Sequence, residues 1–353
     1  MMENVHHIRI VLLTGLGDVV HGLPIANAIR RARPACRISW VAEPMPAGLI
    51  AHHPAIDRVI VFEKKRGTRG VLALRRSLQD DAADITLNLN VYFKSVFPTM
   101  LSPSPRRLGF DRARSHDGVW LFCNEHLRAR PRAHTQDMFL EFLEPLGIAA
   151  QPLEWRLEPT AEELRDQAEF LARENARADA PLVALVTASA NRKKDWPPDR
   201  YIELADRLYA ELGLRPMILG GPGSHEAGIA RHVIRNSSAP VVNALGNGVR
   251  RLVWLIAASR LLIAPDTGPV HIARALEVPV VGLFGHTNPW RVGPYRRYED
   301  LWIDRYTEPG GPPDPANATP RLGRMERITT DEVMEKVSLA LRRYAHAASI
   351  APS

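Results

Sequence analysis

Four residues with the chemistry of a binding turn lie close together: Asp266, Thr267, Gly268 and His271. They follow the apolar run Arg260–Ala264 and precede a helical pattern, so the spacing predicts a strand end, a tight turn and a helix start. At a helix N-terminus, the free backbone N–H groups and the helix dipole favour an anion. The motif therefore predicts a phosphate site at a strand-to-helix turn.

A second candidate is Asp18, which follows the first apolar run of the chain. Gly15 and Gly17 let the backbone turn sharply before it. A carboxylate at such a turn suits a general base, although from spacing alone a helix N-cap is the commoner role. Val20 stands where a dinucleotide-binding fingerprint has its third glycine, but Glu43 stands where a ribose-binding acid belongs. A nicotinamide-dependent oxidoreductase therefore stays open.

A third candidate is the basic loop Thr187–Pro197, which contains Ser189 and Lys194 and follows another apolar run. Hydroxyl donors and an ammonium are suited to a diphosphate. A basic loop on its own is usually just solvated, and Trp196 is more typical of packing than of ligand contact. We expect no metal site, because no CxxC occurs and the paired histidines are adjacent rather than one helical turn apart.

The composition is that of a globular chain of 353 residues, 45% of them hydrophobic. Its two cysteines, Cys36 and Cys123, provide no disulfide framework and suit a reducing compartment. The longest apolar run near the start, Ile10–Leu13, is too short for a signal peptide or a membrane span. We therefore expect a cytoplasmic protein that is still able to lie on a membrane.

The net charge of +7 is concentrated in one window, Ile60–Thr135, which holds fourteen Lys or Arg and seven Asp or Glu. Such a window attracts nucleic acid, anionic lipid or a phosphorylated glycolipid, unless it is simply a solvated basic face. Tyr92 and Phe93 are the only adjacent aromatics in it. Since single-strand binding needs aromatics interleaved with cations, we expect no nucleic-acid partner.

Strand-like and helical patterns alternate through two successive halves of the chain, which predicts an α/β protein with two doubly wound parallel sheets facing a cleft. The predicted strands are Ile8–Leu13, Arg37–Val41, Arg58–Phe62, Asp84–Leu89, Leu182–Val186, Pro216–Leu219, Leu261–Ala264 and Pro279–Phe284. The predicted helices include Leu23–Arg33, Thr135–Leu146, Pro198–Leu212, Arg250–Ala258 and Thr330–Tyr344. We place an N-terminal domain at 1–160, a linker helix at 161–180, a second domain at 181–325 and a final helical segment at 326–353.

Taken together, these loops resemble glycosyltransferase family nine, the bacterial heptosyltransferases of lipopolysaccharide core synthesis. The stretches that carry the resemblance, in family order, are Gly17–His21 with Leu23–Pro24, Lys194–Pro197, Asp266–His271 and Phe284–Pro289. The resemblance covers roughly Ile8 to Tyr295, and the D-T-G-x-x-H signature is its most specific part. Arg274, His286 and Asn288 depart from the residues usual in the family. These departures leave open another nucleotide-sugar transferase of the same fold.

The resemblance implies a GT-B fold and an inverting transfer of heptose from ADP-heptose, without metal or other cofactor. The C-terminal half would bind the nucleotide sugar, and the last helix would cross back to the first domain. By position, Asp18 would be the base and Asp266 would bind hydroxyls of the donor sugar. The diphosphate would be held by Ser189, Lys194, Thr267 and the backbone of Gly268. His271 would belong to the same donor-binding group, with its role open between touching the donor and orienting the loop.

On the acceptor side, the resemblance implies an anionic glycolipid, contacted by Lys64, Lys65, Lys94 and His134. Phosphates and carboxylates of such a lipid would explain the basic window. The enzyme would then work as a peripheral protein at the inner face of the cytoplasmic membrane.

Overall fold

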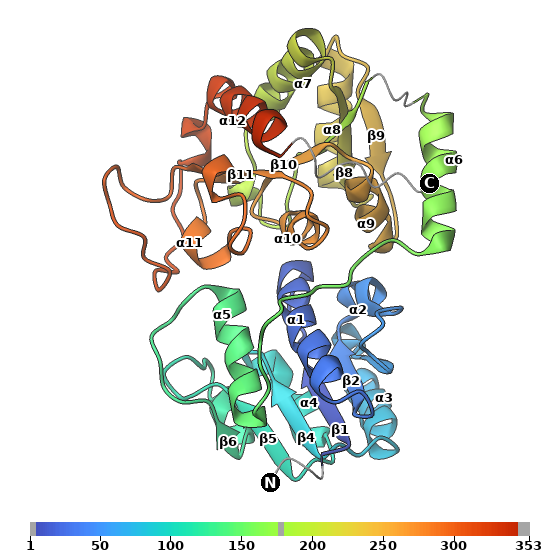
Figure 1. Ribbon diagram of the computed structural model, residues 1–353, viewed down its shortest axis with the longest axis vertical. Helices are drawn as coiled ribbons and strands as arrows, with labels where there is room; N and C mark the ends of the chain where they lie inside the picture. Colours follow the sequence, from blue (N-terminus) through green and yellow to red (C-terminus); the bar gives the residue numbers. More distant parts are fainter. Residues whose placement is uncertain (1–4, 176–179, 345–353) are drawn as a thin grey trace. The chain divides into compact units, whose positions relative to one another are not determined.

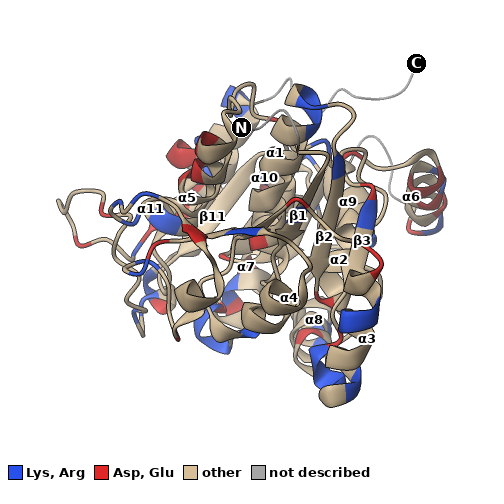
Figure 2. Cartoon of the chain, turned by 90° about the horizontal axis from the view of Figure 1, so that it is seen from below, with Lys and Arg blue, Asp and Glu red and all other residues tan. Residues whose placement is uncertain are grey.

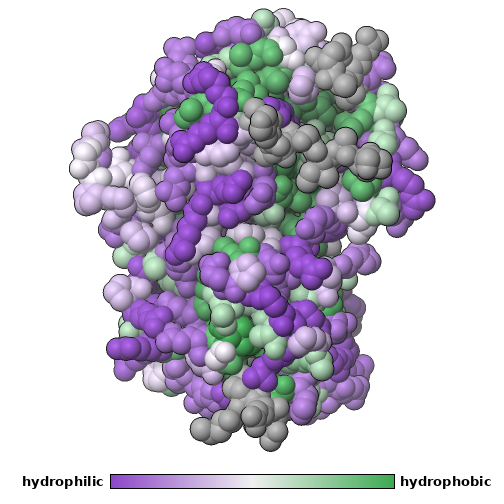
Figure 3. Space-filling view, viewed as in Figure 1, coloured by the Kyte–Doolittle hydropathy of each residue, from purple (hydrophilic) through white to green (hydrophobic). Residues whose placement is uncertain are grey.

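The computed structural model describes residues 5–175 and 180–344. The chain forms two compact units, Met1–Arg156 and Leu157–Ser353, each built around its own sheet (Figure 1). The surface seen in Figure 3 is largely hydrophilic, with hydrophobic residues in separate patches. No helix in the described ranges is long and apolar enough to cross a membrane.

The first unit contains a six-stranded parallel sheet in the order β3-β2-β1-β4-β5-β6. Its strands are β1 (His7–Val11), β2 (Arg37–Ala42), β3 (Arg58–Val61), β4 (Ile85–Asn88), β5 (Arg106–Gly109) and β6 (Glu125–His126). This is the strand order of the Rossmann fold, in which the chain changes direction between β1 and β4. Ligands in such sheets bind beyond the carboxyl ends of the strands at that switch point.

The second unit repeats the arrangement in the order β12-β11-β10-β7-β8-β9. Its strands are β7 (Leu182–Val186), β8 (Arg215–Gly220), β9 (Val242–Leu245), β10 (Leu261–Pro265), β11 (Val280–Phe284) and β12 (Ile303–Asp304). Counted from β7, the order is again that of the Rossmann fold, so the switch point lies between β7 and β10.

Helices connect the strands of both sheets. In the first unit, α1 packs against α2 and α5, and α3 packs against α4, as expected for helices on both faces of a doubly wound sheet. The α-helices are α1 (Leu16–Ala32), α2 (Pro44–Ile50), α3 (Thr68–Gln79), α4 (Val96–Leu101), α5 (Thr135–Leu140), α6 (Ala161–Arg173), α7 (Pro198–Leu212), α8 (Ser224–Asn236), α9 (Arg250–Ala257), α10 (Gly268–Ala275), α11 (Pro289–Val292) and α12 (Thr330–Arg343). Short 3₁₀ helices are η1 (Lys64–Arg66), η2 (Phe93–Ser95), η3 (Val119–Phe122), η4 (Glu141–Leu146), η5 (Arg192–Lys194), η6 (Glu299–Leu301) and η7 (Met325–Arg327).

Helix α1 begins at Leu16, so the predicted start at Leu23 is wrong. Pro24 lies inside the helix and removes one backbone donor. The helix tolerates the loss because its middle is buried from Val19 to Ile29, and packing outweighs local propensity. Gly15 is the N-cap, so Asp18 is not the cap and stands in the first turn.

The segment predicted as a linker contains α6, which is part of the second unit and packs against α9. Gln167 donates from its side chain to the carbonyl of Trp254, and Glu163 pairs with Arg250. At the C-terminus, α12 begins with a capping box on Thr329 and packs against α7 and β11. The part of the predicted crossing segment after residue 344 lies outside the described residues.

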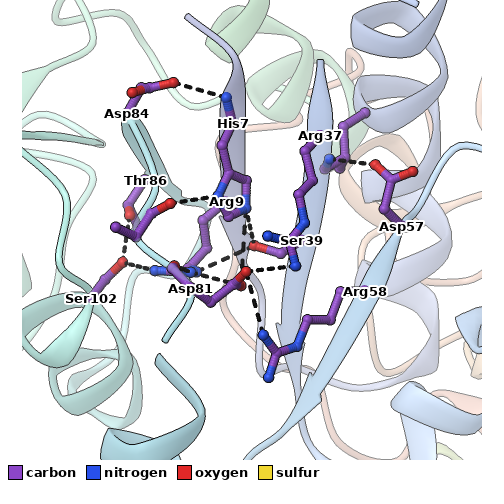
Figure 4. A network of polar contacts seen from close by, with 12 residues as sticks. His7, Arg9, Arg37, Ser39, Asp57, Arg58, Asp81, Asp84, Thr86 and Ser102 are labelled. Atoms are coloured by element: carbon purple, nitrogen blue, oxygen red, sulfur yellow. Dashed lines mark hydrogen bonds and ion pairs between the residues drawn. The ribbon is translucent and has the colours of Figure 1, made fainter. Parts of the chain in front are cut away.

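A buried ionic network binds the amino ends of the strands in the first unit, at the edge opposite the switch-point loops (Figure 4). Asp81 and Arg9 are both fully buried, and the Arg9 guanidinium lies 2.9 Å from Asp81 Oδ2. Arg37 and Arg58 approach the other carboxylate oxygen at 2.7 and 3.4 Å. Burial alone would raise the pKa of Asp81, but the hydrogen bond from Arg9 and the surrounding cations hold it below its usual value. One carboxylate thus ties β1, β2 and β3 together.

Candidate functional site

The switch point of the second unit joins two loops that are far apart in sequence. Lys194 follows β7 and Asp266 follows β10, and these strands are parallel neighbours. The Lys194 Nζ atom lies 2.7 Å from Asp266 Oδ2 and also donates to the Asp266 carbonyl at 3.2 Å. The structure therefore brings together the cation and the carboxylate that the sequence predicted separately.

Asp266 is a buried carboxylate held ionised by its neighbours. Burial works to raise its pKa, but a hydrogen bond with His271 and the charge of Lys194 hold that pKa well below the ordinary range. His271 is buried, and its Nε2 lies 3.9 Å from Asp266 Oδ1. The imidazole of His271, whose role the sequence left open, therefore lies against Asp266.

The N-terminus of α10 lies directly after this pair. Thr267 is the N-cap residue, yet its hydroxyl donates back to the Pro265 carbonyl at 3.1 Å, and no side chain caps the helix. Pro269 in the first turn has no N–H to offer. The backbone at Gly268 and the dipole of α10 therefore have the chemistry that suits an anion.

Ser189 is turned into its own loop. Its backbone N–H and its hydroxyl both lie 2.7 Å from Asp195 Oδ1, and the hydroxyl also lies 2.7 Å from the Asn191 carbonyl. Asp195 Oδ2 is 2.7 Å from Nε2 of His225, at the start of α8. Ser189 therefore shapes the loop that carries Lys194, and its binding of a diphosphate stays a prediction.

Sequence reasoning missed Asp195 and His225. The available signal was the glycine-rich run Gly220–Gly223, which begins at the last residue of β8 and leads into α8. This loop borders β7, and its glycines with a following helix are a pattern suited to phosphate.

The residues that depart from the family pattern have structural partners. His286 donates from Nδ1 to the Arg321 carbonyl at 2.7 Å, and Asn288 donates to the carbonyls of Asp314 and Asn317. Both thus fasten the long irregular segment that precedes η7. Arg274 is buried and donates to the Tyr295 carbonyl at 2.7 Å.

Trp196 is fully buried and donates to the Ile328 carbonyl at 3.0 Å. This contact confirms its expected packing role.

In the first unit, Asp18 lies half-buried in the first turn of α1, beyond β1. Lys94 reaches back from η2 and donates from Nζ to the Leu13 carbonyl at 3.0 Å. Burial lowers the pKa of Lys94, while the carboxylates of Glu43 and Asp18 act in the opposite direction. Asp18 and Lys94 therefore share the switch point between β1 and β4.

Glu43 draws two of the predicted acceptor residues to this place. Its Oε1 lies 2.7 Å from Lys64 Nζ and 3.8 Å from Lys94 Nζ. Sequence reasoning treated Glu43 only as a possible ribose ligand. Its carboxylate instead holds the two lysines close to the loop that carries Asp18.

The other two predicted acceptor residues are placed differently. Lys65 is exposed and has no ion pair among the described residues. His134 is buried at the N-cap of α5, where its Nδ1 accepts from the Gln136 N–H at 3.0 Å. Its ring meets that of His21 edge-on, with centroids 5.5 Å apart. His21 stands one helical turn after Asp18 on α1. His134 therefore contacts the site through the ring of His21.

The basic window is less uniform than its composition suggests. Arg106 pairs with Glu125, Arg114 with Asp111 and Glu141, and several other cations have similar internal partners. The arginines of α3 remain exposed, and Figure 2 shows the blue of basic residues along that helix. Across residues 5–175 and 180–344, no group of three His, Cys, Asp or Glu side chains is placed to hold a metal ion.

Comparisons with known proteins agree with this geometry. Residues 71–309 match the model of glycosyltransferase family 9 (heptosyltransferase). Lipopolysaccharide core heptosyltransferase OpsX of Haemophilus influenzae is 27% identical over 295 residues, which cover 83% of this chain and 82% of the relative. Lipopolysaccharide heptosyltransferase 1 of Pseudomonas aeruginosa is 28% identical over 299 residues, which cover 82% and 81%.

Solved structures show the same fold. The glycosyl transferase family 9 structure from Veillonella parvula superposes with a TM-score of 0.80 at 24% identity, covering 96% of this chain and 97% of the other. The E. coli heptosyltransferase WaaC with ADP gives 0.75 at 20% identity, covering 95% and 99%. The prediction of a GT-B fold with two Rossmann-like units is confirmed. A nicotinamide oxidoreductase and a nucleic-acid-binding protein find no support in these matches. The chain is a glycosyltransferase and belongs to glycosyltransferase family 9, the heptosyltransferases.

Proposed function

We propose that this enzyme transfers a heptose from ADP-heptose to an inner-core sugar of lipopolysaccharide, with inversion at the anomeric carbon and without a metal ion. The observation that carries the proposal is the Lys194–Asp266 pair beside the uncapped start of α10. A cation and a helix N-terminus together are suited to the diphosphate of a nucleotide sugar. The names of two relatives, both lipopolysaccharide heptosyltransferases, support the choice of sugar and acceptor.

In the proposed reaction, Asp18 accepts the proton of the acceptor hydroxyl. The oxygen of that hydroxyl attacks the anomeric carbon of the heptose at the same time. The bond from that carbon to the β-phosphate oxygen breaks, and ADP leaves from the opposite side. The charge that develops on the leaving phosphate is met by the Lys194 ammonium and the backbone at Gly268. Asp266 orients Lys194 and binds hydroxyls of the sugar.

On the acceptor side, we assign Lys64 and Lys94 to the anionic groups of the glycolipid, with Lys65 on the exposed side of the same turn. Glu43 keeps the first two ammonium groups near the Asp18 loop. His134 acts by supporting His21 and the start of α5. The acceptor is anchored in a bilayer, so the enzyme would work at the cytoplasmic face of the inner membrane.

The test is a transfer assay with the purified full-length protein, ADP-heptose and a lipopolysaccharide acceptor that lacks core heptose. We expect a product heavier by one heptose, an inverted anomeric configuration by NMR, and the same rate with and without EDTA. Parallel reactions with UDP- and GDP-sugars examine the departures at His286 and Asn288. Transfer from one of those sugars and not from ADP-heptose would overturn the choice of donor.

A further inference from the structure

Large apolar side chains are exposed mainly in the first unit. Among the described residues, eight of the eleven exposed ones lie between positions 45 and 121. Phe93, Phe97 and Met100 expose 50%, 42% and 50% of their surface. These three residues, which we call the apolar ridge, lie three or four positions apart along η2 and α4. The rings of Phe93 and Phe97 meet edge-on, with centroids 6.4 Å apart.

The apolar ridge is an outward face and not a misplaced core. In α4, Val96, Pro98 and Thr99 are buried, so the helix has an inner face toward the protein. Helix α3 packs beside α4 and buries Leu74 and Leu78 in the core. Helix α3 also carries Leu72, which is 54% exposed, and η3, which contacts α4 as well, carries Leu121, which is 64% exposed. The ridge thus continues across three neighbouring elements.

The segment that leads into and forms α3 is rich in cations, of which Lys64 and Arg66 have acidic partners. The segment Lys64–Gln79 holds six Lys or Arg and no Asp or Glu. Arg69, Arg75 and Arg76 lie three or four positions from Leu72, all are exposed, and none has an ion-pair partner among the described residues. Nearby acids offer little compensation, because Glu63 pairs with Arg66 and Asp80 lies beyond the end of α3.

We propose that the apolar ridge, with Leu72 and the arginines of α3, is the surface by which this enzyme docks on an anionic bilayer. Apolar side chains flanked by cations are the signature of an interfacial membrane contact. A protein partner would need acidic residues placed opposite the arginines of α3. An anionic lipid surface carries negative charge everywhere and needs no such placement.

The position of η2 links docking to catalysis, and here the inference rests on the proposed glycolipid acceptor. Phe93 points outward from this turn, and the next residue, Lys94, reaches inward to the Leu13 carbonyl at the switch point. If Phe93 inserts into the bilayer, Lys94 lies next to the membrane surface. The sugar headgroup of a membrane lipid would then be close to Lys94. Docking would present the acceptor to the site without releasing it from the membrane.

The experiment is vesicle co-sedimentation of the full-length protein, with phosphatidylglycerol–phosphatidylcholine vesicles compared with phosphatidylcholine alone. We expect binding to the anionic vesicles that weakens as salt rises. Two double variants test the surface, F97S/M100S for the ridge and R75E/R76E for the cations. Each should lower vesicle affinity roughly tenfold or more. Matched controls at exposed positions of the second unit, Leu322→Ser and Arg231→Glu, should bind like the wild type.

Thermal unfolding confirms that each variant is folded before it is compared. Equal vesicle binding by the wild type and both double variants would overturn the proposal. The proposal would also fail if the wild type bound no vesicles and instead self-associated through this face. A deacylated acceptor separates the two claims, because transfer to it should be unchanged in F97S/M100S. Failure of all transfer with intact vesicle binding would reject the proposed function and leave the docking surface standing.

Discussion

Lys194 and Asp266 are 72 residues apart in sequence, and their side chains meet over 2.7 Å at the switch point of the second sheet. The pairing follows from topology, since β7 and β10 are adjacent parallel strands whose following loops emerge at the same edge. His271 approaches the same carboxylate from α10. The pair therefore holds an ammonium in place beside a helix N-terminus before any ligand arrives.

Replacing Lys194 by alanine should weaken ADP binding roughly ten- to a hundredfold, because a charge-assisted contact to the diphosphate is lost. Isothermal titration calorimetry measures the change directly. Lys193→Ala is the matched control, since Lys193 is the exposed neighbour on the same 3₁₀ turn and should bind ADP normally. Unchanged ADP affinity in Lys194→Ala would remove the diphosphate role.

Asp266 should make the protein sensitive to acid. Its folded-state pKa is depressed, so its contribution to stability is present above the unfolded-state pKa of about 4 and is lost as the pH falls through the folded-state value. Asp266→Asn should therefore be less stable than the wild type at neutral pH, and the gap should narrow below about pH 4. Urea unfolding at several pH values gives both curves. A gap that stays constant from neutral to acid pH would contradict the ionised pair.

Asp81→Ala should destabilise the first unit by about 3–5 kcal/mol, because it leaves the fully buried guanidinium of Arg9 without its counter-charge. Denaturant unfolding followed by tryptophan fluorescence measures the loss. The exposed pair of Arg31 and Glu154 provides the comparison, and Glu154→Ala should cost below about 1 kcal/mol. Similar losses in the two variants would mean that burial of the network does not matter.

Much of the fold was predictable from local pattern. Buried parallel strands read as apolar runs, and proline and glycine marked the two ends of α7, from Pro198 to the C-cap Gly213. Several short strands at or next to the sheet edges were missed, since β5 begins with two arginines and β6 and β12 have two residues each. The four-residue edge strand β9 was missed as well. The helix predicted for Thr135–Leu146 divides into the α-helix α5 and the 3₁₀ helix η4. Pro145 lies inside η4, where its missing N–H cannot donate to a continuing α-helix.

The sequence predicted which residues belong to the candidate site but not which side chains contact one another. Hydroxyl, ammonium and carboxylate types pointed to Ser189, Lys194 and Asp266. Spacing carried no sign that Ser189 would turn toward Asp195, because that contact depends on how their shared loop folds back on itself. It also carried no sign that Glu43 would hold two lysines, because those contacts depend on which strands become neighbours. That the loops of both units serve one reaction remains a prediction.

The most direct measurement of the central claim is the rate of heptose transfer by Asp18→Asn, set beside the ADP-heptose affinity of the same variant. The isosteric amide keeps the shape of the first turn of α1 and removes the base. The account predicts that kcat falls roughly a hundredfold or more while donor affinity is unchanged. Near-normal turnover by Asp18→Asn would contradict it.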